Sequence, residues 1–307
     1  MSSPDVRDTF DTGGVSVRST LRRVGGKGPL GPVVGSADRA TTWRAVDTTA
    51  GPATLRFSAT TDGRSLVAEG WGPGAAEAMV SVPGLVGLDD DPAGLVPLDD
   101  LVADLTRRFA DHRMTRTGTI WEHLVPTIIG QVVTTVGARR SWQGLVAAHG
   151  RRPPGPCPEA LRLPPTPARL AELGYHDLHR FDIERRRAGV IISCARRAHR
   201  LERCAELPAA EARRHLETVP GIGPWTSSWV TQLAHGDPDA VIVGDYNLPA
   251  LVAWAFAHER TADDERMLEL LEPYRGQRAR VQNLLKMGAP RPPRRGPKLA
   301  PATIRHL

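Results

Sequence analysis

One short stretch, "VPGIGPWTSSW" (residues 219–229), limits what the chain can fold into. It lies between two segments with the periodicity of helices, so the chain must turn within a few residues. A tight turn between helices needs positive φ at some position, and Gly221 or Gly223 provides it at little steric cost. Pro224 suits the first helical position, because the N–H that proline lacks would be unpaired there. The sequence therefore predicts two helices joined by a hairpin.

The two glycines of this hairpin also suggest a binding role. Without side chains at Gly221 and Gly223, the backbone amides lie open beside a helix N-terminus, which favours an anion such as a DNA phosphate. A plain turn between helices is the alternative, and the glycines alone do not decide between the two.

The sequence around the hairpin makes the pattern more specific. "VPGIGPWTSSWV" followed by "VIVGDYNL" resembles the helix-hairpin-helix motif of the DNA glycosylase superfamily that includes endonuclease III, with Asp245 at the catalytic position. Within the superfamily, the AlkA-like 3-methyladenine DNA glycosylase II group is the most similar. "PTIIGQVV" (126–133) and "IERRRAGVI" (183–191) resemble two further helices of that group. The resemblance covers roughly residues 98–288 and implies the same fold and activity.

An aspartate suits the chemistry that this resemblance implies. Breaking an N-glycosidic bond leaves positive charge on the sugar, and one carboxylate can both stabilise that charge and activate the attacking water. We expect Asp245 to have this catalytic role. Without the hairpin, Asp245 would be interpreted as the N-cap of the helix "LPALVAWAFA", and the two roles are compatible.

Aromatic residues flank this aspartate. Trp225 and Trp229 are four residues apart, hence on one helix face, and Tyr246 follows Asp245 directly. Two indoles at this spacing are often part of a core, but the resemblance implies that all three rings surround a flipped base. Alkylated purines are cationic, so aromatic faces attract them through cation–π contacts as well as stacking.

The residue before the hairpin threonine bears on a second activity. Family members that also cut the DNA backbone have a lysine there, because a Schiff base with the sugar needs an amine. This chain has Trp225, and no lysine lies between Lys27 and Lys286. We therefore expect a monofunctional enzyme without AP lyase activity, which releases a base by water attack and leaves an abasic site.

The resemblance also implies contacts with DNA outside the base site. The candidate DNA-binding residues are Gly221, Ile222, Gly223, Thr226, Gln131, Val132, Arg187 and Arg275. Gln131 and Val132 match residues that fill the gap left by the flipped base, although valine is smaller than the leucine expected of a wedge. An ordinary helix is the alternative for this pair, and a solvated charged face is the alternative for the arginines.

No cofactor is expected to be required. The family hairpin holds a monovalent cation through backbone carbonyls, which implies a structural Na⁺ or K⁺ on Glu217, Val219 and Ile222. The three cysteines of the chain are too few and too widely spread for the four-cysteine iron–sulfur cluster of another branch, so no such cluster is expected.

The texture of the chain changes along its length. Alternating runs from Val15 to about Gly87, with a turn at Asp62-Gly63, predict a small antiparallel sheet, and "GAAEAMVSV" predicts a helix. After a linker at residues 89–100, apolar residues recur at helical spacing in "LVADLTRRFADH" and in the long run 121–150.

Further helices are predicted downstream. Thr166-Pro167 has the pattern of an N-cap and first helical residue, and a long helix is expected from about Ile183 to Glu206. The fold class is therefore α+β. Residues 1–97 form an N-terminal antiparallel β/α domain with its linker, 98–290 an all-α helix-hairpin-helix glycosylase part, and 291–307 a basic, proline-rich tail that we expect to be disordered.

The net charge of +6 in 307 residues fits a polyanionic partner without proving one. No apolar stretch approaches the length of a membrane span, so no membrane partner is expected. We expect a monomer in the cytoplasm, of bacterial type and associated with the nucleoid when bound to double-stranded DNA that contains a damaged base.

Three functions stay open on the sequence. The favoured one is a monofunctional glycosylase that removes damaged, alkylated bases in base excision repair. The second is an enzyme of the same fold for another modified, oxidised or crosslinked base. The third is a non-catalytic helix-hairpin-helix DNA-binding protein, for which a carboxylate at Asp245 would have no use.

Overall fold

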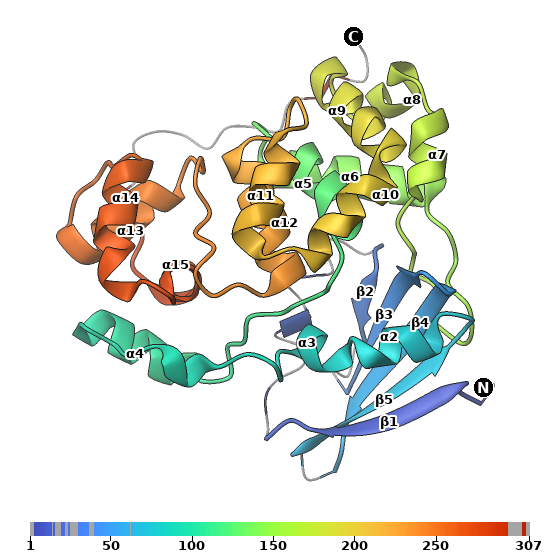
Figure 1. The fold of residues 1–307 in the computed structure, drawn as a ribbon, viewed down its shortest axis with the longest axis horizontal. Helices are drawn as coiled ribbons and strands as arrows, with labels where there is room; N and C mark the ends of the chain where they lie inside the picture. Colours follow the sequence, from blue (N-terminus) through green and yellow to red (C-terminus); the bar gives the residue numbers. More distant parts are fainter. Residues whose placement is uncertain are drawn as a thin grey trace.

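The computed structural model describes residues 3–13, 15, 20–21, 24, 30–36, 40–61, 63–293 and 303–304. A five-stranded antiparallel sheet occupies the N-terminal part, in the order β1-β5-β4-β3-β2 (Figure 1). Its strands are β1 (Val6–Asp11), β2 (Val33–Gly35), β3 (Thr41–Thr48), β4 (Gly51–Ala59) and β5 (Ser65–Trp71). This sheet and the helices that follow confirm the α+β prediction.

The sheet begins earlier than the sequence pattern indicates. Its first strand is Val6–Asp11, which pairs with β5 from Val6↔Gly70 to Asp11↔Ser65. The polar sequence "VRDTFD" hides this strand, because β1 is an edge strand with mostly exposed side chains. Of the alternating runs predicted from Val15 to about Gly87, the first, at residues 15–21, lies largely outside the described residues, as does Asp62 of the predicted turn.

Both faces of the sheet are covered. On one face Leu55 and Phe57 of β4 pack with buried residues of α2 (Ala75–Val80) and α3 (Val82–Val86). On the other face Trp43 and Trp71 stack with ring centroids 5.7 Å apart and pack against Leu161 of the proline-rich connection. The sheet thus has one small core on each face, because successive side chains of a strand point to opposite faces.

Helices make up the rest of the chain. They are α4 (Asp100–Arg108), α5 (Trp121–Ile129), α6 (Thr135–His149), α7 (Pro167–Glu172), α8 (Tyr175–His179), α9 (Arg185–Arg196), α10 (Ala198–Glu202), α11 (Ala209–Glu217), α12 (Pro224–His235), α13 (Leu248–Ala257), α14 (Asp264–Leu271) and α15 (Arg278–Gly288). Short 3₁₀ turns occur at η1 (Pro92–Gly94), η2 (Arg203–Glu206) and η3 (Glu272–Tyr274). The predicted cap at Thr166 is confirmed, since its hydroxyl accepts from the amide of Arg169 at 3.2 Å.

Two cores divide these helices, and α12 belongs to both. Val230 and Ala234 of α12 lie in the core built with α5, α6, α9 and α11. Trp225 and Trp229 pack against the core built with α4, α13, α14 and α15. In Figure 1, α11 and α12 accordingly lie between α13–α15 on one side and α5–α10 on the other. The helix that follows the hairpin is therefore fixed between two packed bodies.

Two helices that the periodicity predicts as continuous are interrupted. The run 121–150 breaks after Ile129, and α6 follows its N-cap Thr134, whose hydroxyl accepts from the amide of Gly137 at 3.1 Å. The segment 183–206 divides into α9, α10 and η2. In the first case Val132 has a left-handed backbone with φ 54°, which no helix tolerates and which periodicity does not reveal.

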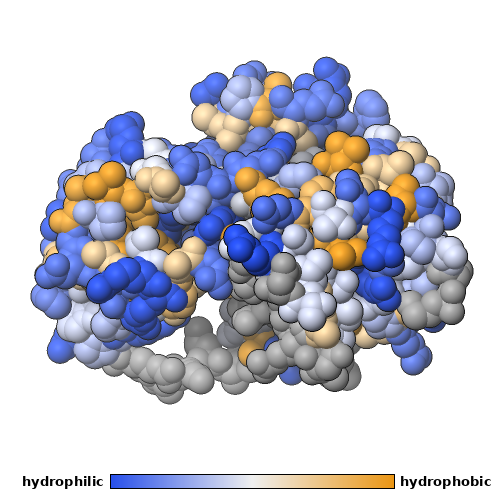
Figure 2. Space-filling model, turned by 90° about the horizontal axis from the view of Figure 1, so that it is seen from below, coloured by the Kyte–Doolittle hydropathy of each residue, from blue (hydrophilic) through white to orange (hydrophobic). Residues whose placement is uncertain are grey.

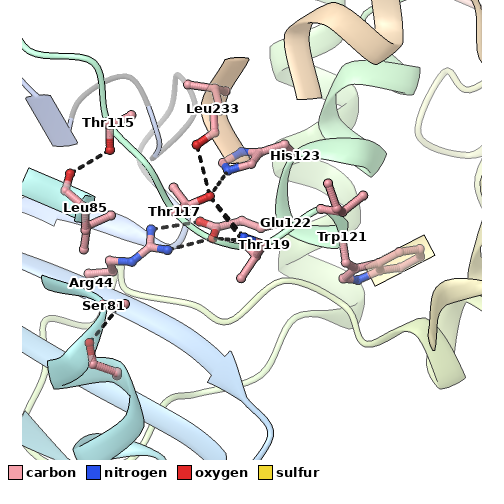
Figure 3. A network of polar contacts seen from close by, with 12 residues as sticks. Arg44, Ser81, Leu85, Thr115, Thr117, Thr119, Trp121, Glu122, His123 and Leu233 are labelled. Atoms are coloured by element: carbon pink, nitrogen blue, oxygen red, sulfur yellow. Dashed lines mark hydrogen bonds and ion pairs between the residues drawn. The ribbon is translucent and has the colours of Figure 1, made fainter. Parts of the chain in front are cut away.

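A buried ion pair joins the sheet to the helices (Figure 3). Arg44 on β3 binds both carboxylate oxygens of Glu122 on α5, at 2.9 and 2.7 Å. Burial alone would raise the pKa of Glu122, but the charges of Arg44 and His123 and the hydrogen bonds from Arg44 and Thr119 together lower it. Beside this pair, burial lowers the pKa of His123 to about 4, and its Nε2 lies 2.7 Å from the hydroxyl of Thr117.

None of the helices in the described parts of the chain is long and apolar enough to cross a membrane. The face in Figure 2 mixes hydrophilic and hydrophobic residues. The domain limits at residues 97 and 290 stay predictions, and the tail beyond 293 lies outside the described residues apart from 303–304.

Candidate functional site

The hairpin between α11 and α12 has the predicted geometry. Gly221 supplies the positive φ, at 93°, and a Cβ on it would lie 2.2 Å from Cγ2 of Val190. Glycine is therefore required here by the backbone and by the space. Gly223 is the extended N-cap of α12, with open space where a Cβ would point, and Pro224 is the first helical residue.

Part of the hairpin backbone is bonded within the turn. The amide of Ile222 donates to the carbonyl of Val219 at 3.0 Å, and the side chain of Glu217 accepts from the hydroxyl of Ser227 at 2.6 Å. The three residues expected to hold a monovalent cation lie between the end of α11 and the start of α12. Their carbonyls as cation ligands stay a prediction.

Gln131 lies against this hairpin. Its Nε2 donates to the carbonyl of Gly221 at 3.0 Å and to the hydroxyl of Thr226 at 2.8 Å. These bonds tie the turn after α5 to the hairpin, so the segments "GQV" and "PGIG" form one unit although they are ninety residues apart. Gln131 thus serves to hold the hairpin in the absence of DNA.

Val132 is next to it and has two unusual properties. Its side chain is 100% exposed, and its φ of 54° is strained for a β-branched residue. Val133 and Val136 beside it are also exposed. Strain of this kind persists only where surrounding contacts impose it, and it occurs often at functional sites.

Arg187 provides one of those contacts. It is buried, and its Nη1 donates to the carbonyl of Ile129 at 2.6 Å while its Nε lies 3.3 Å from Glu184. The guanidinium thus holds the last residue of α5, immediately before the turn that presents Val132. Arg275, the other arginine expected to contact DNA, is exposed and pairs with Glu272.

Asp245 lies where two parts of the site meet. One carboxylate oxygen, Oδ2, accepts from the indole N–H of Trp225 at 3.2 Å. The other, Oδ1, accepts from the amides of Asn247 and Leu248 at 2.8 and 3.1 Å, at the start of α13. The N-cap of α13 is Asn247 and not Asp245, so the capping alternative is wrong in its position, although Asp245 does bind the amides at the start of this helix.

The predicted aromatic residues are not gathered around one point. Trp225 contacts Asp245, and Trp229 is half-buried one turn further along α12. Tyr246 is 95% exposed. The structure thus brings two of the three rings onto one helix face and leaves the third in solvent.

Two residues near the site escaped the sequence reasoning. Asp264 on α14 accepts from the amide of Gly244 at 2.7 Å, directly before Asp245, and its Oδ1 is buried without a partner among the described residues. Lys286 on α15 places its Nζ 4.2 Å from the centroid of the Trp229 ring. Only Lys286 had a sequence signal: Lys27, Lys286 and Lys298 are the lysines among 40 basic residues.

Among the described residues, no group of three or more His, Cys, Asp or Glu side chains is arranged to hold a metal ion. The three cysteines are free thiols, and burial raises the pKa of Cys194 to about 12. The polar groups that the structure brings together are the carboxylate of Asp245 and the indole of Trp225, beside the backbone of the hairpin.

Known proteins were compared with the chain in sequence and in structure. No family model matches the chain. The chain is similar to the "Probable bifunctional transcriptional activator/DNA repair enzyme AlkA" of two Mycobacterium tuberculosis strains, with 29% identity over 168 residues. This match covers 53% of the chain and 34% of the relative, so the chain spans about a third of the length of the curated relatives it matches.

Solved structures match over most of the chain. The 3-methyladenine DNA glycosylase of Archaeoglobus fulgidus has a TM-score of 0.74 at 19% identity, covering 91% of this chain and 96% of that one. The Clostridium acetobutylicum 8-oxoguanine glycosylase/lyase in complex with DNA has a TM-score of 0.69 at 13% identity, covering 92% and 97%. Mag1, the 3-methyladenine DNA glycosylase of Schizosaccharomyces pombe, has a TM-score of 0.51 at 16% identity, covering 63% and 94%.

At these identities the structural likeness establishes the fold. Each of these structures is a DNA glycosylase, and the curated relative is named a DNA repair enzyme. The chain therefore has the helix-hairpin-helix DNA glycosylase fold, and its likenesses in sequence and structure are consistent with the AlkA-like group.

Proposed function

We propose that the chain is a monofunctional DNA N-glycosylase that flips and excises damaged, alkylated bases in base excision repair. The observation that carries this proposal is the carboxylate of Asp245, held between the indole of Trp225 and the first amides of α13. A hairpin built only for binding phosphate has no need of a carboxylate fixed beside it.

Asp245 has the chemistry that base release requires. As the C1′–N bond breaks, positive charge develops on the sugar, and a fixed carboxylate next to it lowers the energy of that state. The same carboxylate accepts a proton from the attacking water. Because three donors already orient Asp245 in the free protein, little reorganisation is needed at the moment of reaction.

The target base must first leave the DNA stack, which costs a few kcal/mol. Val132 would fill the gap, and its full exposure on a turn that Gln131 and Arg187 hold against the hairpin and α5 supports this role. The amides of Gly221 and Gly223 at the hairpin would bind a phosphate of the same strand, whereas the amide of Ile222 already donates to the carbonyl of Val219.

We infer that strand cleavage is absent. The lyase step needs an amine that reaches the sugar, and the hairpin helix presents the indole of Trp225 in the corresponding place. The Clostridium relative is a glycosylase/lyase, so a trapping experiment on this chain is required. Borohydride reduction with a lesion duplex should leave no protein covalently bound to DNA.

The partner and cofactor proposals follow from the same site. Double-stranded DNA with a damaged base is the proposed partner of a monomeric protein, in the cytoplasm and on the nucleoid. No cofactor is required for the hydrolysis, and a Na⁺ or K⁺ ion on the carbonyls of Glu217, Val219 and Ile222 would have a structural role. Three backbone carbonyls suit such a hard cation.

The decisive experiment compares the wild-type protein with Asp245→Asn on duplexes that carry a panel of modified bases. The wild type should produce an abasic site that alkali cleaves, whereas the variant should bind the same duplex without releasing the base. Asp237→Asn, on the loop before the site, is the matched control and should retain activity. If no lesion yields an abasic site, the chain is a DNA-binding protein rather than an enzyme.

A further inference from the structure

A single lysine lies against one of the candidate base-site tryptophans. Nζ of Lys286, near the end of α15, is 4.2 Å from the centroid of the Trp229 ring, which is the geometry of a cation–π contact. The chain uses arginine almost everywhere, with three lysines among 40 basic residues. A compact ammonium group therefore occupies a position where this chain would ordinarily have a guanidinium.

The ring beneath Lys286 is one of those expected to line the base site of the proposed function. Trp229 is one turn beyond Trp225 on α12, and both indoles pack against the core of α13, α14 and α15. Trp225 in turn reaches Asp245. The inference rests on the proposed function in this one respect: a flipped base must come close to this face of α12.

A positive charge already on Trp229 changes which base the site can hold. A cationic purine, such as a 7-methylated guanine, would approach a second unit charge within a few ångströms, in surroundings less polar than water. It would also lose the attraction of the ring face that Lys286 covers. At the Trp229 ring, therefore, the aromatic face no longer attracts a cationic purine, and the lysine charge repels it.

A neutral base gains from the same ammonium group. When the C1′–N bond breaks, its electron pair stays on the base, while the water oxygen bonds to C1′ and its proton passes to Asp245. A neutral base therefore departs as an anion, which an ammonium group stabilises and can protonate, after which solvent restores the lysine proton. A cationic base departs neutral and needs no such help.

We propose that Lys286 makes this site select neutral modified bases over cationic ones. The expected substrate class is an alkylated but uncharged purine, of which 1,N6-ethenoadenine is a test case. This specificity comes from a residue of α15 and not from the hairpin or Asp245.

The experiment measures single-turnover release of 1,N6-ethenoadenine and of 7-methylguanine from otherwise identical duplexes. The wild type should release the neutral base in preference. Lys286→Met should shift the ratio of the two rates towards the cationic base by about tenfold or more, because it removes a unit charge at short range. Lys286→Arg keeps the positive charge but is a poor proton donor, so it should keep a preference for the neutral base, at a reduced level. Arg169→Met, which removes a charge on distant α7, should leave the ratio unchanged.

Thermal melting of each variant separates a folding defect from a change in preference. An unchanged ratio in folded Lys286→Met overturns the inference, and so does a wild type that prefers 7-methylguanine, even if Lys286→Met does not fold. Release of neither base by the wild type, with no abasic site from any other lesion, overturns the proposed function instead.

Discussion

The indole N–H of Trp225 donates to Oδ2 of Asp245 across 3.2 Å, so the hairpin helix and the start of α13 meet at one carboxylate. The other oxygen of Asp245 is held by the amides of Asn247 and Leu248. Each oxygen thus has its own donors, and the plane of the carboxylate is fixed relative to α12. This arrangement gives Trp225 a second role beside any stacking with a base.

Trp225→Phe tests that second role, because it keeps an aromatic ring and removes only the N–H donor. A hydrogen bond to a charged group contributes about 1.5–3 kcal/mol, so the rate of base release should fall by about tenfold or more while DNA binding is largely retained. Trp254→Phe on α13 is the matched control, since that ring packs edge-on against His258. Equal rates in wild type and Trp225→Phe would contradict the role.

Asp264 should position Asp245 through the backbone. Its carboxylate accepts from the amide of Gly244 at 2.7 Å, and Gly244 has a φ of 72°. Asp264→Ala removes the acceptor, so kcat should fall with little change in KM. Asp264→Asn keeps one carbonyl oxygen for the same amide and should retain most of the activity.

The neighbouring Asp263 supplies the control for this pair. It caps α14 by accepting from the amide of Arg266 at 2.9 Å, so Asp263→Ala should cost about 1 kcal/mol of stability and leave base release unchanged. If both alanine variants lower activity only in proportion to their loss of stability, Asp264 has no positioning role.

The hairpin and its neighbours show what sequence reasoning can reach. Local chemistry determines the turn: Gly221 must have positive φ, and Pro224 suits only the first helical position, so the prediction is confirmed residue by residue. The predicted N-cap at Thr166 is confirmed for the same reason, because local chemistry determines it. The resemblance to the glycosylase motif singled out Asp245, and the structure places it beside Trp225.

Contacts between remote segments were beyond the sequence pattern. Lys286 meets Trp229 because α15 packs beside α12, and nothing local to either residue encodes that meeting. The break after Ile129 was missed because the left-handed residue is Val132 and not glycine. Tertiary contacts impose that conformation, and hydrophobic periodicity carries no sign of them.

Val132 is expected to trade stability for function. Val132→Gly removes a β-branched side chain from a left-handed backbone and should stabilise the folded state by about 1 kcal/mol. The same variant loses the group that fills the vacated space in DNA. Base release from a fully paired duplex should therefore fall, while release from an unpaired, bulged lesion should change little.

Thermal melting and single-turnover rates on the two duplexes test both halves of this prediction. Val96→Gly is the control, because Val96 is also well exposed but lies in the linker before α4. Val96→Gly should not stabilise the protein, and it should not change the rate of base release from one duplex relative to the other. A Val132→Gly variant that slows both duplexes equally would contradict a role in base flipping.

The buried His123 should make stability depend on pH. Burial lowers its pKa from 6.5 to about 4, helped by the charge of Arg44 and opposed by that of Glu122. Between these two values the unfolded chain binds a proton that the folded protein does not. Stability is therefore complete above pH 6.5 and is lost as the pH falls towards 4, by on the order of 3 kcal/mol.

Urea unfolding between pH 4 and 6.5 measures this loss as a change in the free energy of unfolding. His123→Gln can still bond to Thr117 but does not titrate, so its stability should fall less steeply over the same range. His176→Gln is the control: that ring is exposed beside Asp177, and its loss should leave the wild-type slope intact. If His123→Gln keeps the full slope, the pH dependence of stability arises from groups other than His123.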